Sequence, residues 1–326
     1  MKAVVYERYG SPDVLELKEI ARPAVKDNEV LVRIHAASAN AYDLHYLRAD
    51  PFFIRLMGAG VLKPRNTRLG ADIAGRVEAV GPGVTQFQPG DEVFGDIAGC
   101  GSGGFAEYVA VPETKLARKP ANVTFEEAAA VPMAALTALQ GLRDRGQIQP
   151  GQKVLINGAS GGVGTFAVQM AKLLGGDVTA VCSPRNVDQA HRLGADAVID
   201  YTQEDFTRNG QRYDVIFAAN GYHSIFDYQR ALSPRGVLVG AGGSMGQIFQ
   251  VMLLGPRLSK TGGQRLAGFL AREDQKDLVA IKEYIEAGKV KPVVDRCYPL
   301  SETAEALRYL GEGHARGKVV ITVAPD

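Results

Sequence analysis

The sequence predicts an α/β protein that combines a doubly wound parallel sheet with a second, β-rich domain, and three observations support this. The chain has 326 residues, which exceeds the size at which one hydrophobic core usually stops growing. Short β-branched runs separated by Gly, Pro and Asp fill the chain up to about residue 120. Beyond Pro120, apolar strands alternate with helical stretches, a pattern typical of a parallel sheet.

The first part of the chain predicts antiparallel β structure. The clearest strands are expected at residues 29–34, 73–80, 91–94 and 105–111. An Ala- and Leu-rich stretch, residues 125–143, then predicts a helix, and Thr124 and Glu127 have the spacing of a capping box at its start. The spacing of apolar residues thus changes from that of strands to that of a helix, and this change predicts a domain boundary.

Buried strands alternate with helices in the second domain. Strands are expected at residues 153–157, 177–182, 197–199, 214–218, 237–240 and 266–270, with helices such as 164–174, 187–193 and 275–287 around them. After Pro292 the pattern is β-like again up to residues 318–323, so we expect the chain to return to the first domain. The expected domains are residues 1–122, residues 123–270, and residues 271–326 as the return.

Composition excludes several classes of protein. The chain carries 37 basic and 36 acidic residues and no run of like charge, so a nucleic-acid partner is not expected. Cys100, Cys182 and Cys297 lack the paired short spacings of disulfide frameworks or structural zinc sites, which favours a reducing, cytoplasmic setting. No apolar run reaches the roughly 20 residues of a membrane-spanning helix.

A glycine-rich loop predicts a dinucleotide site. It follows a predicted strand and precedes an apolar helix, the context that makes such a pattern informative. Its glycines allow a tight turn and a close approach to a pyrophosphate, and the helix N-terminus offers free N–H groups to the anion. The residues expected to bind are Gly158, Ser160, Gly161, Gly162, Val163 and Gly164.

The end of the next strand predicts which dinucleotide binds. An NAD site places Asp or Glu about 20 residues after the loop to hold the ribose hydroxyl, but this chain has Ser183, Arg185 and Asn186 there. The Arg185 guanidinium suits a 2′-phosphate, so the expected cofactor is NADPH. The alternative is that Arg185 lies on a solvated helix start without such a role.

Several motifs along nearly the whole chain resemble the medium-chain dehydrogenase/reductase superfamily. They are the glycine loop and residues 70–75 (GADIAG), 88–93 (QPGDEV), 103–108 (GGFAEY) and 317–320 (GKVV). Within that superfamily the chain is similar to the zinc-free quinone oxidoreductase branch, which is zeta-crystallin-like and includes enone reductases. The resemblance implies a Rossmann domain for NADPH, a GroES-like catalytic domain built from both chain ends, and a homodimer.

The resemblance also implies that zinc is absent. Zinc-dependent relatives carry a ligand Cys where this chain has Asn40, and a ligand His beside Glu where it has Ala71 and Asp72. An amide and a methyl group do not replace a thiolate and an imidazole. Without a metal to stabilise an alkoxide, the chemistry favours substrates that delocalise the incoming charge, namely quinones and α,β-unsaturated carbonyls.

The resemblance places residues 40–46 at the nicotinamide end of the cleft. Asn40 is expected to hydrogen-bond the nicotinamide ribose or the substrate, and His45 or Tyr46 to donate a proton. The alternatives are that His45 and Tyr46 only line the wall while water protonates, and that Asp43 is a structural cap. Further cofactor contacts are implied for Thr137, Tyr201, Asn220, Gly242, Gly243 and Lys318, although a surface position is the commoner one for a lysine.

The sequence is also consistent with two other functions, and it leaves alternatives for the roles of two apolar segments. The chain could instead be a zinc-free, NADP-dependent alcohol dehydrogenase with His45 as its base, or a nucleotide-binding protein without turnover, as in lens crystallins. Residues 51–57 are expected to form a loop that could act as a substrate lid. Residues 245–254 are expected to be a buried or dimer-covering helix, with a membrane-surface contact as the alternative.

Overall fold

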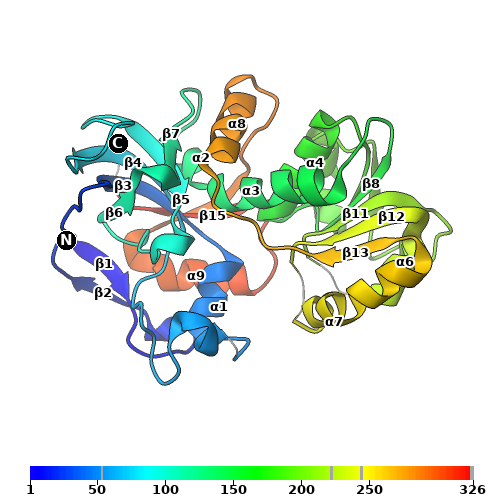
Figure 1. Ribbon diagram of the computed structural model, residues 1–326, viewed down its shortest axis with the longest axis horizontal. Coiled ribbons are helices and arrows are strands. Elements are labelled where there is room, and N and C mark those ends of the chain that lie inside the picture. The colour runs from blue at the N-terminus through cyan, green and yellow to red at the C-terminus, as the bar shows by residue number, and fades with distance from the viewer. Residues whose placement is uncertain (53, 221–222, 243–244, 324–326) are drawn as a thin grey trace. The chain divides into compact units, whose positions relative to one another are not determined.

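The computed structural model describes residues 1–52, 54–220, 223–242 and 245–323 (Figure 1). It divides the chain into two compact units. The first comprises Met1–Met133, Glu273–Gly288 and the chain from Pro292 onward, and the second comprises Ala134–Arg272 with Lys289–Lys291. The first unit is therefore built from both ends of the chain.

The main sheet of the first unit is mixed rather than purely antiparallel. Its strands lie in the order β14 (Val294–Pro299), β15 (Lys318–Thr322), β3 (Glu29–Ala39), β4 (Asp72–Val80), β5 (Glu92–Asp96) and β7 (Leu116–Arg118), and β6 (Tyr108–Pro112) also pairs with β3. β14 and β15 run parallel and the other pairs antiparallel. The antiparallel structure expected up to about residue 120 is confirmed. The parallel pair comes from the returning end of the chain, where helix α9 (Thr303–Gly311) provides the crossover that parallel strands need.

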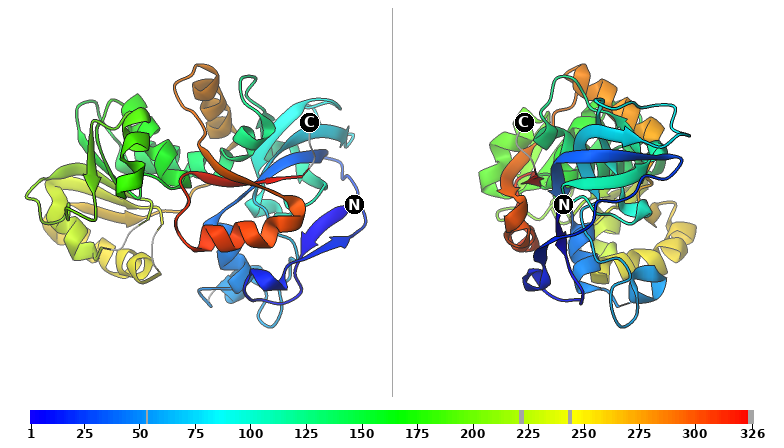
Figure 2. Two further views of the ribbon diagram at one scale, coloured as in Figure 1. Left: turned by 180° about the vertical axis from the view of Figure 1, so that it is seen from behind. Right: turned by 90° about the vertical axis from the view of Figure 1, so that its left-hand side faces the viewer.

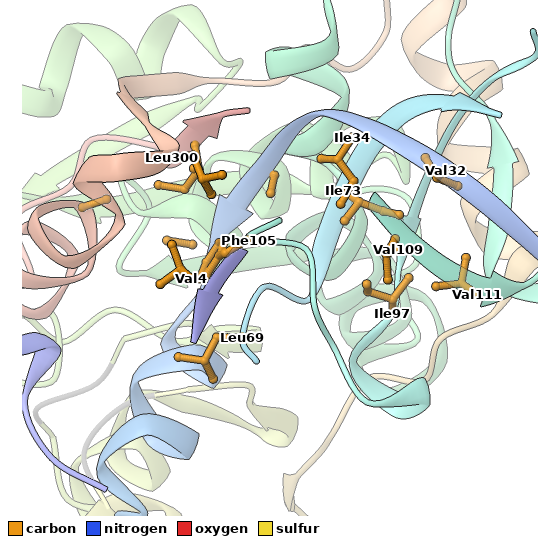
Figure 3. Packing of buried hydrophobic residues seen from close by; sticks show 14 of the residues in the cluster. Val4, Val32, Ile34, Leu69, Ile73, Ile97, Phe105, Val109, Val111 and Leu300 are labelled. Atoms are coloured by element: carbon orange, nitrogen blue, oxygen red, sulfur yellow. The ribbon is translucent and has the colours of Figure 1, made fainter. Parts of the chain in front are cut away.

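The core of the first unit lies under this sheet. Figure 3 shows Val32 and Ile34 on β3 with Ile73 on β4, and Val109 and Val111 on β6. Side chains alternate between the two faces of a strand, and these residues turn one apolar face inward. A small antiparallel sheet of β1 (Lys2–Val5) and β2 (Glu16–Glu19) contributes Val4 to the same core.

The second unit holds the parallel sheet that the sequence predicts. Its strands lie in the order β10 (Ala197–Asp200), β9 (Asp177–Cys182), β8 (Lys153–Asn157), β11 (Tyr213–Ala218), β12 (Leu232–Gly240) and β13 (Arg265–Gly268), and every neighbouring pair is parallel. Helix α4 (Gly162–Leu173) covers one face, and α6 (Ile225–Ala231) and α7 (Met245–Gly262) cover the other (Figure 1). The strand order reverses between β8 and β11, and ligands bind at such switch points.

The helix expected at residues 125–143 is broken. The structure has α2 (Phe125–Ala129), then α3 (Pro132–Gln140) and a wider turn at Gly141–Gly146. The break falls before Pro132, which has no N–H with which to continue a helix but is well suited to begin one. The predicted capping box is confirmed: Thr124 Oγ1 accepts from the Glu127 N–H at 3.2 Å, and Glu127 accepts from the Thr124 N–H at 2.9 Å.

The two apolar segments contain helical structure. The loop expected at residues 51–57 is wrong at its end, because a short π-helix, Arg55–Ala59, begins there. The Arg55 guanidinium lies over the rings of Tyr9 and Phe52 at 4.6 and 5.3 Å. The second begins α7, and there Val251 packs in the core of the second unit. Among the described residues, no helix is long and apolar enough to cross a membrane.

Asp43 ties the start of α1 (Ala41–Arg48) to the loop before β4. Its Oδ2 accepts from the Asn40 N–H and its Oδ1 from the Gly70 N–H, each at 2.8 Å. Complete burial raises the pKa of Asp43 to about 7, although both backbone N–H groups lower it. The structure therefore supports the structural alternative, in which Asp43 positions Asn40 and the backbone at Gly70.

Candidate active site

The glycine loop joins β8 to α4 by the closest backbone packing in this region. Gly158 has φ +82°, a conformation that favours glycine. A Cβ on Gly164 would lie 2.0 Å from the Gly158 carbonyl oxygen, so only glycine lets the first turn of α4 rest on the loop. Gly161 is the N-cap of α4, and the unpaired N–H groups of that first turn form a site for an anion.

The other predicted cofactor residues of the second unit follow neighbouring strands. Because all six strands are parallel, their carboxyl ends share one edge of the sheet. Ser183, Arg185 and Asn186 follow β9, Tyr201 follows β10, Asn220 follows β11 and Gly242 follows β12. Gly243 lies outside the described residues, and Thr137 lies on α3. The loop of β11 adjoins the glycine loop, since a Cβ on Gly158 would lie 2.8 Å from the Asn220 Cβ.

This edge fits an NAD(P) dinucleotide. It combines a helix N-terminus for the pyrophosphate with exposed groups for the adenosine end, because Arg185 and Tyr201 are exposed and Asn186 Nδ2 donates to Ser183 Oγ at 3.0 Å. The neighbouring carboxylate, Asp200, pairs in register with Cys182. Its Oδ1 already accepts from the N–H and the hydroxyl of Thr202 at 2.9 and 2.8 Å.

A buried polar cluster in the first unit joins Asn40, Asp72 and Lys318. β15 and β4 both pair with β3, which places Val319 opposite Ala39 and Asp72 opposite Ser38. Figure 2 shows β15, at the red end of the colour range, running beside blue β3. The Lys318 ammonium donates to Asn40 Oδ1 and, at 3.1 Å, to Asp72 Oδ2. Lys318 is only 4% exposed, so the alternative of a surface lysine is wrong.

Sequence reasoning missed the part that Asp72 plays in this cluster. Asp72 Oδ2 also accepts from Ser38 Oγ at 3.0 Å and Asn40 Nδ2 at 2.9 Å, and its Oδ1 accepts from the Met133 N–H at 2.9 Å. Burial raises the pKa of nearby Asp96, and the charge of Asp72 raises it further. The sequence did hold a signal for this role. Asp72 is an acid in the GADIAG motif, and the chain lacks the zinc ligands that would explain an acid there.

His45 and Tyr46 lie further along α1 and make different contacts. His45 Nδ1 lies 2.8 Å from the Asp50 carbonyl oxygen; because a carbonyl only accepts, Nδ1 carries the hydrogen and Nε2 is an acceptor in the neutral ring. The Tyr46 ring packs 4.4 Å from that of Tyr42. None of the hydrogen bonds described for the chain links either residue to the Asn40, Asp72 and Lys318 cluster.

The donor set of this cluster does not fit zinc. Ala71 offers no ligand atom where zinc-dependent relatives carry one, and the polar atoms of Asn40 and Asp72 already hold an ammonium group. Across the described part of the chain, no group of three or more His, Cys, Asp or Glu side chains could hold a metal ion.

Comparisons with known proteins agree with this architecture. A model described as "Alcohol dehydrogenase GroES-like domain" matches residues 26–121, and one described as "Zinc-binding dehydrogenase" matches residues 193–321. The 2-methylene-furan-3-one reductase of Solanum lycopersicum is 37% identical, and the chloroplastic NADPH-dependent alkenal/one oxidoreductase of Arabidopsis thaliana is 35% identical. Each match covers 100% of this chain and 80% of the relative.

A solved structure is also closely similar. The quinone oxidoreductase from Coxiella burnetii superposes with a TM-score of 0.88 at 29% identity, over 99% of both chains. Fold, site and relatives together define an NAD(P)-dependent oxidoreductase. The chain belongs to the medium-chain dehydrogenase/reductase superfamily, and within it to the quinone oxidoreductase branch.

Two glycine substitutions separate the structural and binding roles of the loop. Gly164→Ala should lower the free energy of unfolding by about 1–3 kcal/mol, because the methyl group overlaps the Gly158 carbonyl. Gly161→Ala should leave stability nearly unchanged, since its Cβ would have only one neighbour, at 3.8 Å, but should weaken dinucleotide binding by crowding the anion site. Thermal unfolding and nicotinamide fluorescence titration measure the two effects. Equal stability losses would contradict this packing.

Proposed function

We propose that this protein reduces quinones or α,β-unsaturated carbonyls with NADPH and without zinc. The observation that carries the proposal is the buried cluster in which Asn40, at the position that matches a zinc-ligand Cys in relatives, and Asp72 both accept from the Lys318 ammonium. The names of the relatives, a furanone reductase and an alkenal/one oxidoreductase, support the same reaction class.

NADPH, when bound, supplies the hydride. The protein residues then have separate tasks in the proposed reaction. The first turn of α4 holds the pyrophosphate, and Ser183 with Arg185 holds the 2′-phosphate. Tyr46 stacks on a flat substrate, and Tyr46, His45 or water returns a proton to the reduced product. Because a conjugated substrate spreads the incoming charge over its own π-system, hydrogen-bond donors suffice where an alcohol substrate needs a Lewis acid.

One observation favours a second candidate, alcohol oxidation. His45 donates Nδ1–H to the Asp50 carbonyl, which leaves Nε2 suited to accept a proton rather than to donate one. A solved structure titled as an NAD-dependent alcohol dehydrogenase is 33% identical, with a TM-score of 0.85 over 99% of this chain and 100% of that chain. A third candidate is nucleotide binding without turnover.

A single substrate panel tests the proposal. Purified protein with NADPH should lose nicotinamide absorbance when a naphthoquinone or an enone is added, and a chelator should not slow the reaction. Alcohols with NADP⁺ should give no comparable rate. Turnover of alcohols alone would favour the second candidate, and tight NADPH binding with no acceptor reduced would favour the third. Activity that disappears with a removed zinc ion would contradict the metal-free mechanism.

Arg185 tests the cofactor preference. The glycine loop binds the pyrophosphate that NADPH and NADH share, so discrimination must come from the loop after β9. Arg185→Ala should weaken NADPH binding about ten- to a hundredfold, the equivalent of roughly 1.5–3 kcal/mol for a charge-assisted hydrogen bond. NADH binding should hardly change. Equal weakening of both cofactors, measured by titration, would show that Arg185 does not bind the 2′-phosphate.

One edge of the parallel sheet bears on the assembly of the protein. β13 lies at the edge of the parallel sheet and Leu270, just beyond it, is 89% exposed, a combination that a partner subunit would cover. We therefore propose a homodimer, and we propose a cytoplasmic location because Cys100, Cys182 and Cys297 are all free thiols. Light scattering at micromolar concentration should give twice the 34.8 kDa of the chain, and a monomer mass would contradict the dimer.

A further inference from the structure

Asn40 has no hydrogen-bond donor left to offer a ligand. An amide nitrogen has two hydrogens, and those of Asn40 Nδ2 point to the Ser38 carbonyl at 3.2 Å and to Asp72 Oδ2 at 2.9 Å. The orientation of the amide is settled chemically, because the Lys318 ammonium carries only donors and must therefore face Oδ1. Asn40 can still accept a hydrogen bond, but it cannot stabilise a negatively charged oxygen.

Asp72 is occupied as well. Its two oxygens accept from four donors, which are Lys318 Nζ, Asn40 Nδ2, Ser38 Oγ and the Met133 N–H. Oδ2 takes three of these donors and Oδ1 takes one. Asp72 thus balances the buried ammonium, whose charge would otherwise be costly to remove from water.

Lys318 is the member of the cluster with an open donor. An ammonium has three N–H groups, and the described residues take two of them. None of the hydrogen bonds described for the chain joins Asp43 or Asp96 to this ammonium; the described bonds of these two carboxylates go to backbone N–H groups. The third N–H is a charged donor held in place by two strong acceptors.

We propose that Lys318, rather than Asn40, is the hydrogen-bond donor of this site, and that its third N–H receives an anionic oxygen of the bound reactants. The inference rests on the proposed function. Two oxygens have the required chemistry: the substrate oxygen that gains negative charge when hydride adds to the conjugated system, and a phosphate oxygen of the cofactor. Of the other two N–H groups, one donates to Asn40 Oδ1 and so fixes the orientation of that amide, and the other donates to Asp72 Oδ2.

The decisive variant removes both charges of the ion pair together. Lys318→Met alone leaves Asp72 buried and unpaired, which could unfold the protein. Lys318→Met with Asp72→Asn leaves no unpaired charge, and Lys318→Arg keeps a cationic donor. Lys119→Met is the matched control, because the Lys119 side chain, also in the first unit, is only 7% exposed and its ammonium lies 3.3 Å from Glu92. Thermal unfolding confirms that each variant is folded.

Two readouts identify the oxygen. If Lys318 binds the substrate oxygen, the double variant should lose about ten- to a hundredfold in kcat at saturating NADPH while its Kd for NADPH, from fluorescence titration, stays unchanged. If Lys318 binds a phosphate, the Kd values for NADPH and NADP⁺ should rise by that factor while kcat at saturation stays unchanged. Lys318→Arg should recover part of the loss in either case, and Lys119→Met should show neither effect.

The outcome that overturns the proposal is a folded double variant with unchanged kcat and unchanged cofactor binding. Failure of the proposed function gives a different result, because the wild-type protein would then reduce neither quinones nor enones. The binding titrations still decide the matter in that case: weaker cofactor binding by the double variant supports Lys318 as a phosphate ligand, and unchanged binding rejects it.

Discussion

The first unit depends on one buried ion pair, between Lys318 at the start of β15 and Asp72 at the start of β4. A charge removed from water is tolerated only when its partner and its remaining hydrogen bonds are in place, and both partners here are less than 5% exposed. Because β15 comes from the far end of the chain and lies beside β3, the pair forms only when the sheet is completed. The polar cluster is thus complete only when strands from both ends of the chain are in place.

The second unit meets a different constraint, which is steric and local. Its binding edge needs a backbone that approaches a ligand closely, and the glycine loop provides this through Gly158 and Gly164, where side chains would collide with neighbouring backbone. Backbone N–H groups bind the part of the dinucleotide that all such cofactors share. In the proposed function, side chains after β9 distinguish one cofactor from another, which would put affinity and preference in separate segments.

These two constraints explain what the sequence could and could not predict. The strand, glycine loop and helix at residues 153–173 were predictable because their pattern is local and each glycine has a backbone reason. The helix expected at residues 125–143 was wrong because Pro132 starts a new helix instead of bending the first. The burial of Lys318 was missed because its partner, Asp72, is 246 positions away, and no short-range pattern distinguishes a buried lysine from a surface one.

An internal ammonium and a metal ion impose different limits on chemistry. A metal accepts electron pairs and can lower the pKa of a bound hydroxyl by many units, which makes an alkoxide accessible. An ammonium can only donate hydrogen bonds, and Lys318 has already committed two of them to Asn40 and Asp72. One remaining charged donor can stabilise an anion that its own π-system already delocalises, but it is a weak substitute for a Lewis acid on a localised alkoxide. The composition of this cluster is therefore a reason why conjugated carbonyls suit the proposed reaction better than alcohols.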